Sequence, residues 1–124
     1  MYRYNAVLVR VIDGDTIDAM IDLGFEVQIK KRIRFAGINA PESRTRNLAE
    51  KKAGLAAKER VIELLDGAAN VFELESIELG KYGRVIGRIH ISKLAGKDII
   101  TQVCINDTLV KEGYAVEYDG GKRL

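Results

Sequence analysis

Residues 32–42 read RIRFAGINAPE, and this stretch contains the signals that decide how the chain folds. Ile33 and Phe35 favour a strand, because β-branched and aromatic side chains suit a half-buried pleated surface. Arg34 lies between them, where a cation is costly to bury unless an anionic group meets it. Pro41 lacks an N–H and disfavours helix at the residue before it, so the strand must end in a stiff turn. The stretch predicts a phosphate site, a metal site or a corner of mutually neutralised charges.

The residues before this stretch predict two further strands. Apolar residues alternate over 7–12 and again over 16–21, and the segment Asp13-Gly14-Asp15 separates the two runs. Asp-Gly between alternating runs is a hairpin signal. A second turn at Leu23-Gly24 leads into residues 27–38, so the first part of the chain predicts a three-stranded meander.

The residues after it predict two helices and further strands. A helix is expected over residues 48–65, with one apolar stripe formed by Leu48, Leu55, Val61, Ile62 and Leu65. Gly54 weakens this pattern and predicts that the ordered helix begins near it. Short strands are expected over 71–74, 84–92 and 98–104. Asn106 fits an N-cap for a second helix that ends before Gly113, and this reading outweighs the glycosylation sequon at 106–108.

These elements define the fold class. Five or more strands in meanders with two helices predict a mainly β protein, a small five-stranded barrel of OB type. A two-layer α+β sheet is the alternative. With 124 residues, we expect one domain over 1–124.

Composition narrows the class of protein. Apolar residues make up 47% and charged residues 31%, as in ordinary globular proteins, and no apolar run is long enough for a membrane span. The alternating start, MYRYNAVLVRVID, has no signal-peptide core, which predicts a cytoplasmic protein, with a mature secreted form as the alternative. A single cysteine excludes an intrachain disulfide and a cysteine zinc site. The net charge is +2, yet residues 30–60 hold ten basic and three acidic side chains, which favours a polyanionic partner or a solvated helix face.

Several polar residues could supply chemistry. Asp13 and Asp15 are two residues apart, which would put them on one side of an extended segment, where a hard divalent cation would relieve their repulsion. A tight turn flanked by aspartates is the simpler explanation. Arg34 and Arg84 could together grip a phosphodiester, because each guanidinium matches two phosphate oxygens. Asn39 and Glu42 add oxygen ligands and a carboxylate that can handle water.

Four motifs in order then resemble one family. VIDGDT (11–16), RIRFAGINAPE (32–42), KYGR (81–84) and NDTLVKEGYA (106–115) follow the order found in the staphylococcal-nuclease-like (thermonuclease) family. The resemblance covers about residues 5–118, and the segment 42–60 is similar to the stand-alone phage and bacterial versions.

The resemblance implies an OB-fold barrel that uses one calcium ion to cleave DNA and RNA with little sequence preference. Its catalytic positions correspond to Arg34, Glu42 and Arg84. Its metal positions correspond to Asp15, Asn39 and the backbone carbonyl of Ala40, with Asp13 as the nearby second aspartate. Its substrate contacts correspond to Lys81, Tyr82 and Tyr118.

One residue departs from the family pattern. Asn39 stands where the family has a second calcium-binding aspartate, so the site loses a negative charge and we expect weaker metal binding. The expected partners are single-stranded or frayed DNA and RNA, the expected state is a monomer, and no membrane partner is expected. A catalytically weakened nucleic-acid-binding module of the same fold is the alternative function. A purely structural corner would leave the four ordered motifs unexplained.

Overall fold

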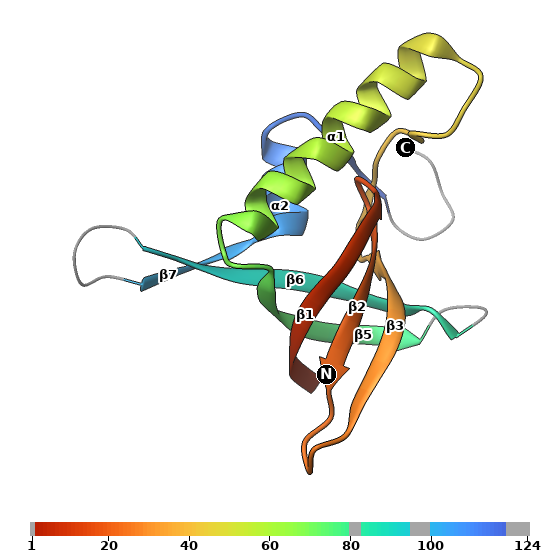
Figure 1. Cartoon of the computed structure of the whole chain (residues 1–124). Coiled ribbons are helices and arrows are strands. Elements are labelled where there is room, and N and C mark those ends of the chain that lie inside the picture. The colour runs from red at the N-terminus through yellow and green to blue at the C-terminus, as the bar shows by residue number, and fades with distance from the viewer. Residues whose placement is uncertain (1, 80–82, 95–99, 119–124) are drawn as a thin grey trace.

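Five strands close into a barrel in the computed structural model, which describes residues 2–79, 83–94 and 100–118 (Figure 1). The strands are β1 (Tyr2–Asp13), β2 (Thr16–Asp22), β3 (Gln28–Phe35), β5 (Val71–Leu79) and β6 (Val85–Leu94). The first three form the predicted antiparallel meander, and β1 and β6 both pair antiparallel with β5. A parallel pairing between β3 and β6 closes the barrel. The predicted OB-type fold is confirmed, and the two-layer sheet is wrong.

The remaining elements lie around this barrel. β7 (Ile100–Cys104) extends the sheet as a hairpin with β6, and the two-residue strands β4 (Ile38–Asn39) and β8 (Val116–Glu117) pair with each other. Helix α1 (Leu48–Asp66) crosses one end of the barrel, and α2 (Ile105–Lys111) packs beside it (Figure 1). The barrel core comes from the inward positions of the strands, among them Ile17, Ile33, Leu74 and Ile89.

Helix α1 packs partly through the small residues Gly54 and Ala57, which the sequence pattern did not indicate. Its buried positions are Gly54, Ala57, Val61 and Leu65. Val61 and Leu65 of the predicted apolar stripe are thus buried as expected, whereas Leu48, Leu55 and Ile62 are exposed. The helix also begins at Leu48, capped by the Asn47 side chain, so the expected ordered start near Gly54 is wrong. No helix in the described part of the chain is long and apolar enough to cross a membrane.

Asn106 is buried between α2 and the barrel, where its side chain forms hydrogen bonds to the barrel backbone. Its predicted role as the N-cap of the helix is wrong. The residue before α2 is Cys104, and Asn106 lies within the first turn with no exposed surface. Its Nδ2 donates to the carbonyl oxygens of Ala36 at 2.9 Å and Gly87 at 3.2 Å. Its Oδ1 accepts from the backbone N–H of Ile89 at 3.0 Å. Three backbone groups are thus satisfied by one amide, which explains a polar residue at a core position.

Candidate active site

The hairpin between β1 and β2 carries the first predicted site residue. Asp13 pairs with Thr16, so Gly14 and Asp15 are the two central residues of a tight turn. A Cβ on Gly14 would lie 2.6 Å from the Cβ of Ala57 and 3.1 Å from that of Ala40. The turn therefore fits between α1 and the strand-end loop only because residue 14 has no side chain.

Asp15 joins this turn to the loop after β4. Its Oδ2 accepts a hydrogen bond from the backbone N–H of Ala40 at 2.8 Å, and its Oδ1 accepts from the Thr16 hydroxyl at 2.9 Å. The carbonyl oxygen of Asp15 accepts from the N–H of Phe35 at 2.8 Å. Asp15 is 7% exposed, so this carboxylate is held in one place beside the end of β3.

Arg34 meets the anionic partner that its position in the strand requires. Its Nη1 lies 3.5 Å from Oδ2 of Asp15 and donates to the carbonyl oxygens of Asp15 and Phe35. Its Nη2 donates to Oδ1 of Asn39 at 3.2 Å. The Arg34 side chain is 19% exposed, so the guanidinium is oriented by the protein while part of it still faces solvent. Three of the predicted site residues are therefore brought together.

Asp13 holds the loop that follows Glu42. Its Oδ1 accepts hydrogen bonds from both the backbone N–H and the hydroxyl of Ser43. Ser43 is buried at 3% exposure, so the contact anchors the loop from within. Ser43 is a residue that sequence reasoning missed, because its role arises from a contact between positions thirty residues apart.

Glu42 is fixed through its backbone and free at its carboxylate. A Cβ on Gly54 would lie 2.3 Å from the carbonyl oxygen of Glu42 and 2.6 Å from the N of Ser43, so α1 supports this loop at van der Waals distance. The Glu42 side chain is exposed, and no hydrogen bond or ion pair to another described residue engages it. Sequence reasoning missed this function of Gly54. The available signal was a glycine inside a helical pattern, a position that costs helix stability and so requires a packing reason.

A hollow of about 270 Å³ lies beside this loop. Its walls include Asn39, Ala40 and Glu42 from the loop and Glu50 from α1. The lining also includes Gly113, Tyr114, Ala115 and Val116, from the segment between α2 and β8. The space beside Glu42 is therefore large enough to admit water and part of a substrate.

Arg84 reaches the same region through the parallel pairing of β3 with β6. Ile86 lies opposite Arg34 in this pairing and Val85 lies opposite Ile33, which puts Arg84 at the level of Arg32, two residues before Arg34. Arg84 is exposed. Lys81 and Tyr82 lie outside the described residues.

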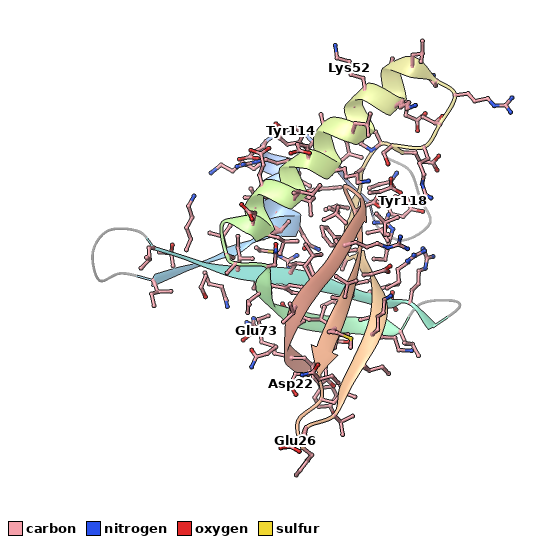
Figure 2. The ribbon with its side chains drawn as sticks, in the orientation of Figure 1. Asp22, Glu26, Lys52, Glu73, Tyr114 and Tyr118 are labelled. Carbon is pink, nitrogen blue, oxygen red and sulfur yellow. The ribbon has the colours of Figure 1, made fainter. Side chains whose placement is uncertain are left out.

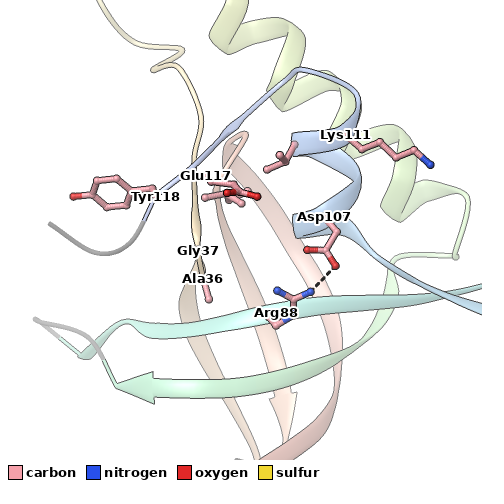
Figure 3. A pocket seen from close by; sticks show the side chains of 9 residues that line it. Ala36, Gly37, Arg88, Asp107, Lys111, Glu117 and Tyr118 are labelled. Atoms are coloured by element: carbon pink, nitrogen blue, oxygen red, sulfur yellow. Dashed lines mark hydrogen bonds and ion pairs between the residues drawn. The ribbon is translucent and has the colours of Figure 1, made fainter. Parts of the chain in front are cut away.

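Tyr118 follows β8, close to β4 but beside a different hollow. Its backbone N–H donates to the carbonyl oxygen of Gly37 at 2.9 Å. Its side chain lines a hollow of about 450 Å³ together with the Arg88–Asp107 ion pair (Figure 3). Asn39 and Glu42 do not line this second hollow. Of the three expected substrate contacts, Tyr118 alone is described.

The oxygen atoms near Arg34 suit a hard divalent cation. Asp15 contributes a carboxylate and Asn39 an amide oxygen, and the contact between Asp15 and the Ala40 N–H brings residue 40 to the same place. Oxygen-only donor sets favour Ca²⁺ or Mg²⁺ over softer metals. Among the described residues, no three His, Cys, Asp or Glu side chains cluster to hold a metal. The oxygen donors fit calcium, and the carboxylate of Asp15 is the one negative charge among these three residues.

Two comparisons with known proteins indicate the family to which the chain belongs. A family model described as "Staphylococcal nuclease homologue" matches residues 32–123. The chain is also 29% identical over 117 residues to "Micrococcal nuclease" from Shigella flexneri, an alignment that covers 93% of this chain and 59% of that protein. The chain thus spans about three-fifths of the length of this curated relative. The family match includes the end of β3, the loop with Glu42, both helices and Arg84, and on this basis the chain belongs to the family of staphylococcal nuclease homologues.

Proposed function

We propose that residues 1–124 form a single calcium-dependent nuclease domain that hydrolyses phosphodiester bonds of DNA and RNA with little sequence preference. The observation that carries this proposal is the oriented Arg34. Its guanidinium is held by Asp15 and Asn39 at the end of β3, beside a loop that leaves the carboxylate of Glu42 free. The similarity to a protein named micrococcal nuclease supports the same activity.

Each residue has a distinct role in this proposal. Arg34 and Arg84 bind the oxygens of the scissile phosphate and stabilise the negative charge that grows as water attacks phosphorus. Glu42 accepts a hydrogen bond from that water and orients or deprotonates it. Asp15, Asn39 and the carbonyl of Ala40 would hold the calcium ion. When bound, the ion supplies Lewis-acid polarisation of the phosphate. Lys81, Tyr82 and Tyr118 are proposed substrate contacts.

A nucleic-acid-binding module without strong catalysis is the second candidate. The amide of Asn39 favours it, because Asp15 is then the one carboxylate among the three proposed metal ligands. The ligands of this binding module would be single-stranded DNA and RNA. The two candidates differ in whether bound strands are cut.

A cleavage assay distinguishes these candidates. Single-stranded DNA incubated with the protein in millimolar calcium should be degraded, and chelator should stop the reaction. Glu42→Gln keeps the size of the side chain and removes its ability to take a proton, so the rate should fall by about 10²–10⁴-fold. Glu59→Gln, an exposed change on α1, is the matched control and should cleave normally. Tight binding without cleavage in any metal would instead establish the binding module.

Asn39→Asp tests the proposed metal ligands. The new carboxylate adds a negative charge beside Asp15 and should lower the calcium concentration needed for half-maximal activity. It should also increase the rise in melting temperature that added calcium produces, because a ligand stabilises the folded state according to its affinity. A calcium response that is unchanged by both measurements would show that Asn39 is not a ligand.

A further inference from the structure

A second arrangement of charged residues lies on the outer face of the barrel. Asp18 of β2 is paired with Arg10 of β1 on one side and Arg32 of β3 on the other. Nε of Arg10 donates to Oδ2 of Asp18 at 3.0 Å. Nε and Nη2 of Arg32 donate to Oδ1 at 2.9 Å and Oδ2 at 3.3 Å. We call these three residues the arginine clasp.

The arginine clasp has the charge and exposure of an anion site. Asp18 shares the outward side of β2 with Met20, since Ile17 and Ala19 point into the core, yet Asp18 is only 5% exposed. The two arginines cover it, and their own side chains remain 62% and 42% exposed. The hydrogen bond from Arg32, assisted by Arg10, lowers the pKa of Asp18 to about 2, so the carboxylate stays ionised and orients both cations. Two guanidinium groups against one carboxylate leave one positive charge facing solvent.

The clasp adjoins the candidate active site. Thr16 pairs with Arg34 and Asp18 pairs with Arg32, so Arg32 and Arg34 are consecutive outward residues of β3, about 7 Å apart along the strand. This spacing is close to the length of one nucleotide in an extended single strand. A strand with its scissile phosphate at Arg34 can place a neighbouring phosphate on the clasp.

Acidic residues limit this surface on its other sides. Asp22 and Glu26 lie at the far end of the β2–β3 hairpin, away from Tyr118 and α1 (Figure 2). On β5, Glu73 accepts a hydrogen bond from Arg3, and Glu75 is hydrogen-bonded to His90. Lys30 continues the basic row of β3 in the direction of Asp22. The positive surface is thus a short stripe that leads from the candidate active site.

We propose that the arginine clasp binds the backbone phosphate next to the scissile one and so directs this nuclease toward polymeric strands rather than isolated phosphodiesters. This inference rests on the proposed function for the cleavage reaction. The clasp positions the substrate and takes no part in the chemical step. Its two arginines present several N–H donors to a phosphate while Asp18 keeps them from collapsing onto other groups.

The test compares a polymer with a small diester. The double variant R10Q/R32Q is assayed on a twelve-nucleotide single strand and on bis(p-nitrophenyl) phosphate. We expect kcat/KM on the oligonucleotide to fall about tenfold or more, because charged hydrogen bonds to phosphate are lost, with no change on the small diester. The slope of log affinity against log salt should also decrease by about 0.7 for each lost phosphate contact. The matched control K51Q/K52Q makes the same charge change on the exposed side of α1 and should have little effect on either substrate.

Two further measurements keep the outcome interpretable. Removing both arginines leaves Asp18 buried without a partner, so R10Q/D18N/R32Q is tested in parallel and should give the same substrate selectivity with better folding. Strand binding is also measured by fluorescence anisotropy in chelator, where no cleavage occurs. A wild-type protein that binds but never cuts would overturn the proposed nuclease, and weaker strand binding by both multiple variants would still support the clasp. Wild-type affinity and salt slope in both multiple variants would overturn the clasp itself.

Discussion

Arg34→Gln is expected to slow phosphodiester cleavage by about 10²–10³-fold, the loss typical of removing one donor aimed at transition-state charge. Glutamine cannot replace the guanidinium fork of Arg34, which contacts with Asp15 and Asn39 hold in place. The loss should appear in kcat, because Arg34 is proposed to bind the transition state more strongly than the substrate. Single-turnover cleavage of a labelled oligonucleotide measures it directly.

Two companion variants make this result specific to the guanidinium. Arg34→Lys keeps the charge without the bidentate geometry and should recover only a small part of the rate. Arg46→Gln removes an exposed cation from the loop before α1 and should cleave normally. Since Arg34 is mostly buried beside Asp15, its variants are assayed well below their melting temperatures. A rate for Arg34→Gln within threefold of wild type would exclude a catalytic role.

Asn106→Ala is expected to destabilise the fold by about 3 kcal/mol, which is a large part of the stability of an average domain. The substitution leaves the N–H of Ile89 and the carbonyl of Ala36 without this side-chain partner, while the carbonyl of Gly87 keeps only the hydrogen bond from the Ala36 N–H at 2.8 Å. The melting temperature should fall by roughly 10 °C. Urea unfolding followed by circular dichroism measures the free-energy change.

A control at an exposed asparagine shows whether the expected loss of stability depends on the buried position of Asn106. Asn5→Ala, an exposed change on β1, should alter stability by less than about 0.5 kcal/mol. Asn106→Asp keeps the acceptor for Ile89 and loses both donors, so it should also be strongly destabilised, more so as the new carboxyl ionises. A loss below 1 kcal/mol for Asn106→Ala would mean that water or a backbone shift replaces the three hydrogen bonds.

The fold could be predicted from sequence because its signals are local. Alternation in β1 and β2, the turn at Gly14 and the strand that ends before Pro41 each depend on neighbouring residues. The orientation of α1 could not be predicted in this way. Its packing depends on the absence of a side chain at Gly54, where the backbone of Glu42 passes, and three residues of the expected stripe, Leu48, Leu55 and Ile62, point outward although Val61 and Leu65 are buried.

The candidate site was predicted as a set of residues but not as an arrangement. Arg34 stood out because a cation between two core residues needs a partner, and Asp15 is that partner. Asn106 was misassigned because a polar residue before a helix looks like a cap, whereas its three bonds run to segments distant in sequence. The arginine clasp has no sequence signal at all, since it depends on the register of three strands.

The parallel pairing of β3 with β6 has a consequence for how activity arises during folding. Arg34 and Arg84 come from segments separated by the whole of α1 and β5, and only barrel closure aligns them. The entropy of closing such a long loop must be lost before any of these contacts forms, so this pairing belongs among the slow steps of folding. The meander of β1 to β3 can form early and already holds Arg34 against Asp15. It contains only one of the two arginines proposed to bind the phosphate, because Arg84 lies just before β6. If the proposed function holds, a chain released before closure would bind anions without cutting them, and hydrolysis would begin only when β6 pairs with β3.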